Sequence, residues 1–382
     1  MRIGVLTSGG DVPGVNPCIR TLVYRAIDEG YEVLGIRRGW EGLIFTDPDD
    51  PISIQENTLI LDKIITRAID RTGGTILHTS RINPENVSVE NIPEFLLSNI
   101  SNRNQIEAAD LTPHIIKVLE RLHLDVLVVI GGDDTLIYAD HLQRENIPII
   151  AIPKTMDNDV YGTDYTIGFS TAITRSVKLI HQLRTSSGSH ERVSVVELFG
   201  RKIGEVCLIT AYLASADRCI IPEIPFDPDR LLGLLLEDRA KNPSKYAIVL
   251  MSEGARFIDS SFSGIPKSNE DQVLPVGRLT AEFIKTEGKV STLYQHLAYL
   301  MRSGVSDSLD LMVASNFANL AVELIKSKRL GRMVSLQNGH YTHVPVTILA
   351  ENKKRLDIDK FYNPEAYCPN IKSIKDMPLF LY

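Results

Sequence analysis

Two short stretches of the chain combine acidic, basic and glycine residues in a pattern that suits phosphate chemistry. GGDDT at residues 131–135 follows the apolar run VLVVI, and PKTMDND at residues 153–159 follows the apolar run PIIAI. Polar residues just beyond the carboxyl ends of neighbouring parallel strands face the crevice in which open α/β sheets bind ligands. Several acids and a lysine are costly to bury there unless they bind a metal ion and phosphate groups. The two stretches therefore indicate phosphoryl transfer.

Phosphoryl transfer needs a metal ion on the donor, cations on the moving group and a positioned base for the acceptor hydroxyl. Asp133 suits a Mg²⁺ ligand, while Lys154 and Arg201 offer positive charge to the phosphoryl oxygens. Asp157 suits the base, and we expect Lys154 to favour its ionisation more than burial and Asp159 oppose it. The alternative for Asp157 and Asp159 is a purely structural role in capping a turn.

A third stretch, TSGGD at residues 7–11, lies between an apolar strand at 3–6 and a helix that begins near Gly14. A second strand at 33–36 completes a βαβ unit. A Gly-Gly turn before a helix presents backbone N–H groups that favour a phosphate. The alternative is an ordinary βα turn, because the stretch matches neither GxGxxG nor GxxxxGK[ST].

Strands and helices alternate along the rest of the chain, which predicts an α/β fold with largely parallel sheets. Further strands are expected at 193–197, 219–223 and 246–251, and helices at 113–122, from about 173 to 185–188, and at 308–328. Residues 85–110 are polar and are expected to form a surface insertion. Five strand ends carry a glycine or a charge, which we expect on one edge of a parallel sheet: Gly10, Asp133, Asp157, Arg201 and Glu253.

Length and charge narrow the classes of protein. The 382 residues suffice for two compact domains or one large α/β body. The formal charge of −7 argues against a nucleic-acid partner, so the charge that binds an anion must be local. No segment reaches the roughly 18 apolar residues of a membrane span, and the N-terminus lacks the long apolar run of a signal peptide. No membrane partner is therefore expected.

The cysteine pattern indicates a reducing compartment. The four cysteines show no CxxC or metal-finger spacing: Cys18, Cys207, Cys219 and Cys368. Scattered cysteines in apolar surroundings are typical of reduced core residues. The expected location is cytoplasmic.

Taken together, the motifs resemble those of the phosphofructokinase family. TSGGDVPGVN, GGDDT, PKTMDND, GTDYTIGF, TSSGSHERVSVVE, FGR and SEG occur in the family's order along most of the chain. GGDxT alone also resembles NAD kinases and diacylglycerol kinases, but neither would need the SEG and MRSG sugar-site segments. The resemblance implies two Rossmann-like domains with the active site in the cleft between them. Residues 1–167 with about 276–350 would bind the phosphate donor and Mg²⁺, and residues 168–275 with about 351–382 would bind the sugar phosphate.

The resemblance also implies roles for individual residues. Asp157 would take the proton from the 1-hydroxyl of fructose 6-phosphate, and Asp133 would hold Mg²⁺. The implied donor site comprises Gly10, Arg81, Gly132, Asp134 and Thr135. The implied sugar-phosphate site comprises Thr155, Met156, Asp157, Arg192, Phe199, Gly200, Arg201, Glu253, Tyr299 and Arg302. In such enzymes some basic residues that grip the 6-phosphate come from a neighbouring subunit. Arg192 is therefore a candidate to cross an interface in a homodimer or homotetramer.

Two positions indicate the phosphoryl donor. ATP-using members resemble GGDG(S/T), whereas Asp134 here replaces the glycine and would add bulk and repulsion in a poorly solvated site. Lys154 stands where many ATP enzymes have glycine, and it can contact a small free phosphate, although some ATP-using members keep this lysine. The pair resembles the pyrophosphate-dependent branch. The alternatives are an ATP-dependent phosphofructokinase and a catalytically silent regulatory subunit, and the intact Asp133, Asp157 and Arg201 argue against the latter.

Three positions depart from the family's usual pattern. Tyr299 replaces a histidine of the substrate-binding stretch, whereas Arg302 is kept. Leu293 stands where an arginine is usual, so one phosphate contact across the subunit interface is left open. Phe199 replaces the usual methionine, which is a conservative apolar change. The sequence leaves open the oligomeric state, effectors and the use of sedoheptulose 7-phosphate.

Overall fold

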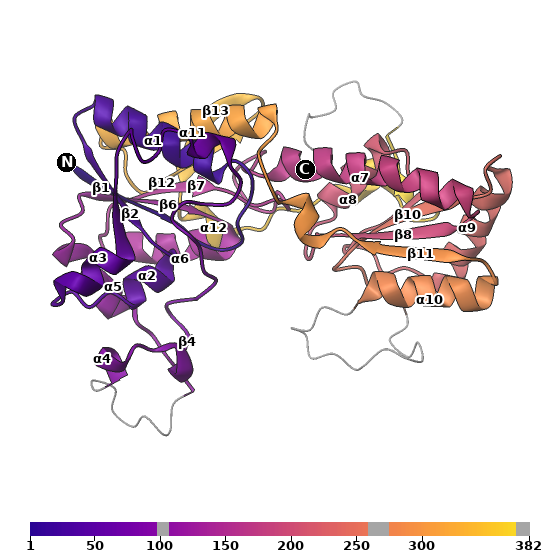
Figure 1. Ribbon diagram of the computed structural model, residues 1–382, viewed down its shortest axis with the longest axis horizontal. Helices are drawn as coiled ribbons and strands as arrows, with labels where there is room; N and C mark the ends of the chain where they lie inside the picture. Colours follow the sequence, from indigo (N-terminus) through magenta and orange to yellow (C-terminus); the bar gives the residue numbers. More distant parts are fainter. Residues whose placement is uncertain (98–106, 259–274, 372–382) are drawn as a thin grey trace. The chain divides into compact units, whose positions relative to one another are not determined.

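The computed structural model describes residues 1–97, 107–258 and 275–371, so expectations for the remaining residues lie outside it. The chain forms two compact units, each built from three chain segments (Figure 1). Unit 1 contains residues 1–155, 160–168 and 303–354. Unit 2 contains residues 156–159, 169–302 and the chain from residue 355 onward. The chain therefore passes repeatedly from one unit to the other.

Unit 1 is built on a seven-stranded sheet with the order β13-β12-β7-β6-β1-β2-β3. Its strands are β1 (Arg2–Thr7), β2 (Glu32–Ile36), β3 (Thr58–Leu61), β6 (Val126–Gly131), β7 (Ile149–Pro153), β12 (Arg332–Gln337) and β13 (His340–Pro345). The edge strands β3 and β13 run antiparallel to their neighbours, and the inner pairs are parallel. Every residue of β6 is buried, as a central parallel strand requires.

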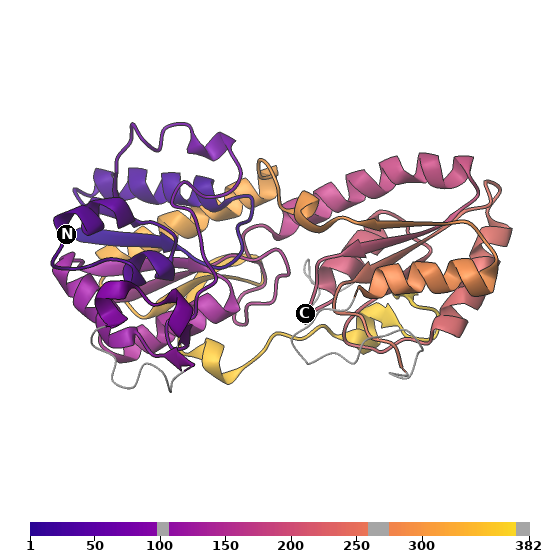
Figure 2. The same cartoon turned by 60° about the horizontal axis from the view of Figure 1, so that its bottom comes forward.

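Helices cover both faces of this sheet. Helices α1 (Val15–Asp28) and α11 (Ser308–Lys326) pack together on one face (Figures 1 and 2). The other face carries α2 (Trp40–Ile44), α3 (Pro51–Asn57), α5 (Thr112–Arg121), α6 (Asp133–Arg144) and α12 (Ile348–Glu351) (Figure 1). The polar insertion contains the short elements β4 (Val87–Ser88), α4 (Glu94–Leu97) and β5 (Ala108–Ala109).

Unit 2 is built on a fully parallel four-stranded sheet with the order β11-β8-β10-β9. Its strands are β8 (Val193–Leu198), β9 (Arg218–Ile220), β10 (Ala247–Ser252) and β11 (Thr292–His296). Its helices are α7 (Phe169–Ser189), α8 (Glu205–Leu213), α9 (Pro228–Lys241), α10 (Val276–Gly288) and α13 (Ile358–Phe361). The segment from 355 adds the hairpin of β14 (Tyr362–Asn363) and β15 (Cys368–Pro369), which contacts β9. The α/β fold with largely parallel sheets is thus confirmed.

The expected placement of residues 276–302 in the donor domain is wrong. These residues form α10 and β11, and β11 pairs in parallel with β8 of unit 2. The chain returns to unit 1 only at Ser303. The reason is the sheet pairing, because a five-residue ladder fixes β11 to β8 and carries α10 with it.

Helix α7 is longer than expected, since it continues through residues 185–188 to Ser189. Hydroxyl groups in its last turns donate to carbonyls four residues earlier, as Ser187 does to Leu183 at 3.0 Å. Ser187 is also buried and hydrogen-bonded to Ser194 of β8 at 2.6 Å. Packing against β8 therefore outweighs the weak helix propensity of serine and glycine.

Helix α11 contains no run of about 18 apolar residues, yet its length and mean hydropathy are those of a possible membrane span. Among the described residues α11 meets both criteria, with half of its apolar window buried. The same helix packs against α1 and buries Asp310, which accepts a 2.6 Å hydrogen bond from the Tyr165 hydroxyl. A core helix of a soluble protein passes the same test, so the criteria carry little weight here.

The four cysteines form no disulfide bond among the described residues. Cys18, Cys207 and Cys219 are buried, and Cys368 is half-buried. Burial raises the pKa of Cys18 to about 12, so this thiol stays protonated at neutral pH.

Candidate active site

In unit 1 the turn after β1 is held by hydrogen bonds on both sides. The Ser8 N–H donates to the Ile130 carbonyl of β6 at 3.1 Å, and the Gly9 N–H donates to the Ser80 carbonyl at 2.8 Å. The Thr79 hydroxyl donates to the Gly9 carbonyl at 2.6 Å. Gly9 has a φ of +85°, a backbone conformation that residues other than glycine rarely adopt. The turn at the expected donor site is therefore fixed in shape.

A buried ammonium group lies against this turn. A Cβ atom on Gly9 would be 3.0 Å from Lys154 Nζ and 3.4 Å from Thr135 Oγ1. Lys154 is only 3% exposed, and it directly follows β7. The Lys154 side-chain nitrogen and the Thr135 hydroxyl group thus lie beside the turn at Gly9, and both groups can donate to a phosphate.

Two other expected donor residues flank this cluster along the chain. Gly10 is half-buried and follows Gly9 directly, whereas Arg81 is exposed and follows Ser80. Because the Ser80 carbonyl accepts from the Gly9 N–H, the backbone of Arg81 is tied to the same turn.

The two glycines at the start of α6 differ in what the packing of the chain requires of them. A Cβ on Gly131 would lie 2.2 Å from the side chain of Thr135, so packing demands glycine there. A Cβ on Gly132 would meet only the Lys154 carbonyl, at an ordinary 3.6 Å, and its φ of −84° suits any residue. Packing within the chain therefore leaves open space over Gly132, which a ligand could enter.

The two acids of GGDDT occupy the first turn of α6, where the helix dipole favours negative charge. Asp133 is half-buried, whereas Asp134 is exposed. The expectation of a poorly solvated Asp134 is therefore wrong, and water weakens its repulsion of a nucleotide. The Asp134 side chain still occupies more space than the glycine of the ATP-using members.

The described residues contain no group of three or more His, Cys, Asp or Glu side chains that could hold a metal ion. Mg²⁺ commonly binds one or two carboxylates and takes its other ligands from water and substrate phosphates. A half-buried carboxylate that follows the open space over Gly132 fits that arrangement. Asp133 is thus a suitable single protein ligand.

In unit 2 the turns after β8 and β10 are packed into one another. The Gly254 N–H donates to the Gly200 carbonyl at 3.1 Å. A Cβ on Gly254 would lie 2.1 Å from the Arg201 carbonyl, so the close approach needs glycine. Arg201 Nε is 3.0 Å from Glu253 Oε1, with Arg201 57% exposed and Glu253 7% exposed. The carboxylate holds the guanidinium at the surface, where it is accessible to a ligand.

A second cation stands beside these turns. The Arg302 guanidinium lies 4.6 Å from the centre of the Tyr299 ring and 5.5 Å from that of Phe199. The two rings meet edge to face at 5.9 Å, and the Phe199 N–H donates to the Met301 sulfur at 3.4 Å. Arg302 is 9% exposed and Tyr299 is 64% exposed. The sequence patterns missed Met301, because an apolar residue in a short 3₁₀ turn carries no signal for this contact.

Asp157 belongs to unit 2, whereas Thr155 belongs to unit 1. Met156 is buried, and Asp157 is half-buried with its Oδ1 atom inaccessible to solvent. Burial, together with the neighbouring carboxylates of Asp159 and Glu253, raises the pKa of Asp157 to about 8.

Within unit 2 the groups around Asp157 oppose its ionisation, whereas the contribution expected from Lys154, which belongs to unit 1, stays a prediction. Arg201 and Arg302 lower its pKa, but burial and the two neighbouring acids outweigh them. The carboxyl group is consequently protonated at neutral pH in the unliganded protein.

Arg192 does not join the sugar-phosphate cluster of its own chain. It precedes β8, whereas Phe199 follows β8, and six strand residues at about 3.3 Å each separate the two by roughly 20 Å. Leu293, which stands at the position of the missing arginine, pairs with Ser194 at the same end of the sheet. The two positions expected to serve a neighbouring subunit thus lie close together, far from the cluster.

The five polar strand ends do not share one sheet edge. Gly10, Asp133 and the segment before Asp157 follow β1, β6 and β7 of unit 1, while Arg201 and Glu253 follow β8 and β10 of unit 2. The same local signal at strand ends occurs in both sheets, so it does not reveal which strands pair.

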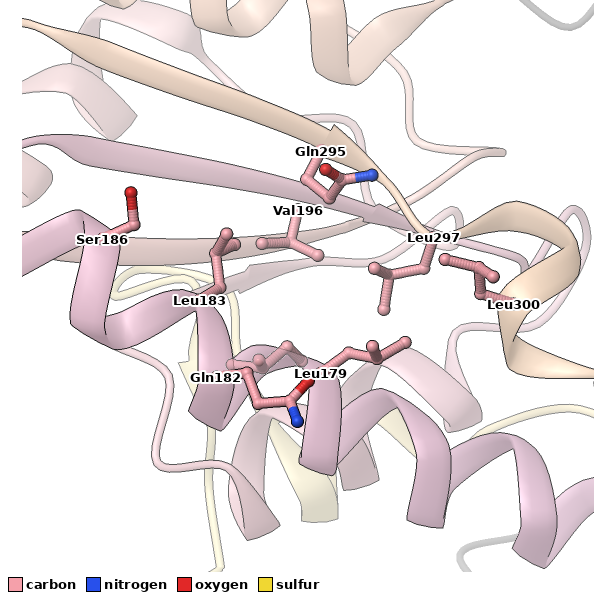
Figure 3. Close-up of a pocket in the computed structure, with 9 residues that line it drawn as sticks. Leu179, Gln182, Leu183, Ser186, Val196, Gln295, Leu297 and Leu300 are labelled. Carbon is pink, nitrogen blue, oxygen red and sulfur yellow. The ribbon is translucent and has the colours of Figure 1, made fainter.

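A cavity of about 310 Å³ in unit 2 contains none of these residues (Figure 3). It lies between α7 and the strands β8 and β11, with mostly apolar walls. Its lining is Leu179, Ile180, Gln182, Leu183, Ser186, Val196, Gln295, Leu297 and Leu300. No charged group points into it, so it does not suit a phosphorylated ligand.

Unit 1 carries donors that suit a phosphate, and unit 2 carries a carboxyl–arginine cluster, which is a combination typical of small-molecule phosphotransferases. The model of the family described as phosphofructokinase matches residues 2–325. The chain belongs to the phosphofructokinase family.

Relatives within this family differ in their named donor. An ATP-dependent 6-phosphofructokinase of Streptomyces coelicolor is 34% identical over 374 residues, covering 96% of this chain and 99% of the relative. A pyrophosphate--fructose 6-phosphate 1-phosphotransferase of Thermoproteus tenax is 34% identical over 357 residues, covering 92% of this chain and 94% of the relative. The structure of a pyrophosphate-dependent phosphofructokinase from Nitrosospira multiformis has a TM-score of 0.75 at 18% identity. The match covers 97% of this chain and 89% of that chain. The last comparison supports the fold alone.

Proposed function

We propose that the protein transfers a phosphoryl group from pyrophosphate to the 1-hydroxyl of fructose 6-phosphate in the presence of Mg²⁺. The products are fructose 1,6-bisphosphate and phosphate. Because phosphate rather than ADP is released, the reaction lies near equilibrium and runs in both directions. The observation that carries the proposed donor is the buried Lys154 ammonium beside Gly9 and Thr135.

The residues of the two units take different parts in this reaction. The 1-hydroxyl oxygen forms a bond to the distal phosphorus as the bridging P–O bond breaks, and the hydroxyl proton passes to the ionised carboxylate of Asp157. Lys154 and Arg201 offset the charge on the phosphoryl oxygens. Mg²⁺ bound at Asp133 would neutralise the pyrophosphate oxygens.

The sugar phosphate is assigned to the cluster of unit 2. Arg302 and the exposed Tyr299 hydroxyl offer donors to the 6-phosphate, while Glu253 and Arg201 face the sugar. Phe199 supports Arg302 by a cation–π contact, so the guanidinium is held in place before a ligand arrives.

ATP is the second candidate donor, and two observations favour it. Curated relatives of similar identity are named ATP-dependent, and the exposure of Asp134 weakens its repulsion of a nucleotide. A small, highly charged pyrophosphate gains more from the buried Lys154, because a desolvated charge contact is stronger than an exposed one.

The donor assay separates the two candidates. We expect purified protein with Mg²⁺ and fructose 6-phosphate to turn over with pyrophosphate and to show little or no activity with ATP. In the variant Asp134→Gly with Lys154→Gly, pyrophosphate activity should fall and ATP activity should become measurable. Bisphosphate formation is measured in both cases. If the unchanged protein is active with ATP and inactive with pyrophosphate, the pyrophosphate proposal is overturned and the family assignment stays intact.

We also propose that the enzyme is a homodimer or homotetramer in which Arg192 serves the site of a neighbouring subunit. Arg192 lies at the opposite end of β8 from the sugar-phosphate cluster of its own chain. Its Nε atom is buried and has no hydrogen-bond partner among the described residues. A phosphate of a neighbouring site would supply such a partner.

Subunit mixing tests this arrangement. Asp157→Ala and Arg192→Ala chains carrying different affinity tags are coexpressed, and hybrids are isolated by purification on both tags. In a hybrid, one site combines an intact Asp157 with an intact Arg192 from the other chain. We expect coexpressed dimers to recover about a quarter of wild-type activity, because about half are hybrids with one intact site in two. Purified hybrids as inactive as both parents would contradict the shared site.

A further inference from the structure

Asp157 lies in a four-residue segment that belongs to unit 2 and connects two segments of unit 1. Residues 156–159 belong to unit 2, although Thr155 before them and Val160 after them belong to unit 1. A segment this short contributes no secondary structure of its own to hold it in place. Its position in unit 2 must therefore come from side-chain contacts.

One such contact is fully buried. The Asn158 Nδ2 atom donates a hydrogen bond to Glu205 Oε2 at 3.0 Å, and both residues are 0% exposed. Asn158 has a φ of +56°, a left-handed conformation that asparagine tolerates better than most residues. A hydrogen bond is stronger where water is excluded, so this contact resists separation.

Glu205 is itself held firmly. It is the first residue of α8, and the preceding Gly204 donates its N–H to Glu223 Oε1 at 2.8 Å. A Cβ on Gly204 would lie 2.5 Å from the Ile221 side chain, so the start of α8 packs tightly on the segment after β9.

The same loop carries a residue of the reaction. Arg201 follows β8 and precedes Glu205 by four positions, and its guanidinium is fixed by Glu253. One loop therefore holds both a cation expected at the phosphoryl group and the acceptor that anchors the neighbour of Asp157.

We propose that Asn158 and Glu205 form a tether that positions the Asp157 carboxyl group against the sugar-phosphate cluster of unit 2. The two are positioning residues, because they act through Asp157 and the loop of Arg201. This inference rests on the proposed function, in which Asp157 accepts the hydroxyl proton. A purely structural role would predict a loss of stability without a specific change in how Asp157 titrates.

An exchange of donor and acceptor tests the tether with near-isosteric variants. Asn158→Asp places two carboxylates against each other, so the contact breaks and kcat should fall about 100-fold, as expected for a misplaced reacting group. Glu205→Gln added to Asn158→Asp restores a hydrogen bond in the opposite direction. We expect the double variant to recover most of the lost kcat. The KM for fructose 6-phosphate should change only a few-fold throughout.

A third variant removes the amide without adding charge. Asn158→Gly keeps the left-handed backbone accessible, and we expect a lower kcat and a pH midpoint of kcat/KM that moves down towards that of an ordinary carboxyl group. The groups around Asp157 that also set this midpoint, Asp159, Glu253, Arg201 and Arg302, are unchanged. The matched control is Asn146→Gly, an exposed asparagine with a φ of +64° after α6, which should behave as wild type.

The outcomes distinguish this inference from the proposed function. If wild type converts fructose 6-phosphate with neither pyrophosphate nor ATP, the proposed function fails before any variant is measured. If wild type is active and Asn158→Asp keeps the wild-type kcat and pH midpoint, the tether is refuted. It is equally refuted if the folded double variant is no faster than Asn158→Asp, or if Asn158→Gly lowers only the melting temperature.

Discussion

Replacement of Asp157 by asparagine is expected to lower kcat by about 10²–10⁴-fold, the range for loss of a positioned general base. Asparagine matches the shape of the side chain but accepts no proton at neutral pH. The sugar-phosphate contacts expected from Tyr299 and Arg302 remain, so the KM for fructose 6-phosphate should stay within a few-fold. Steady-state kinetics with saturating donor measures both quantities.

The matched control is Asp49→Asn, which removes a carboxylate from an exposed pair with Lys117 at 3.2 Å. Exposed pairs contribute little, so we expect wild-type turnover and folding. Wild-type turnover of Asp157→Asn itself would remove Asp157 as the base and require another proton acceptor for the hydroxyl.

The pH dependence of kcat/KM is the second large effect. The pKa of Asp157 is raised to about 8, so the ionised base is the minor form at neutral pH. Because only the ionised form accepts a proton, kcat/KM should rise about tenfold per pH unit up to the midpoint and then level off. A profile measured from pH 6 to 9 checks this, since kcat/KM reports the free enzyme.

The free energy of unfolding should fall as the pH rises, whereas kcat/KM should increase. The folded carboxyl group binds its proton more tightly than the unfolded one, whose ordinary pKa is 3.8. This contribution to the free energy of unfolding is complete below that value and is lost as the pH rises through about 8. Asp157→Asn should flatten this part of the stability profile. A kcat/KM that is level from pH 6 to 9 would contradict the raised pKa.

Local patterns in the sequence predict the strands and their turns well. An all-apolar run such as residues 126–130 suits a buried strand, and the Gly-Gly turn after it marks the start of α6 at Asp133. The family resemblance and the α/β fold are both confirmed for this reason. Such patterns depend on residues close together in the chain.

Pairing between distant segments could not be predicted in the same way. Nothing in the composition of β11 distinguishes a partner in unit 2 from one in unit 1, yet its ladder with β8 decides the unit to which 276–302 belong. The hairpin of β12 and β13 was missed as well, although it completes the sheet of unit 1.

The candidate site shows the same difference between features set by neighbouring residues and features set by distant ones. Gly10, Asp133 and Arg201 lie in turns whose composition stands out, so residue types and spacing were sufficient to select them as candidates. Glu205 carries no such signal, because an acid in the first turn of a helix is common. Its contact with Asn158 joins residues 47 positions apart. The raised pKa of Asp157 likewise depends on burial, which only the folded chain provides.

The interleaving of the two units has a consequence for synthesis on the ribosome. Strand β7, which precedes Lys154, lies between β6 and β12, and β12 begins only at residue 332. Throughout translation of residues 169–302, an unfinished sheet of unit 1 has β7 as an open edge. Such edges invite pairing with other chains. Unit 1 is thus begun first and completed after most of unit 2, so this edge stays unpaired for longer than it would in a domain built from one continuous segment.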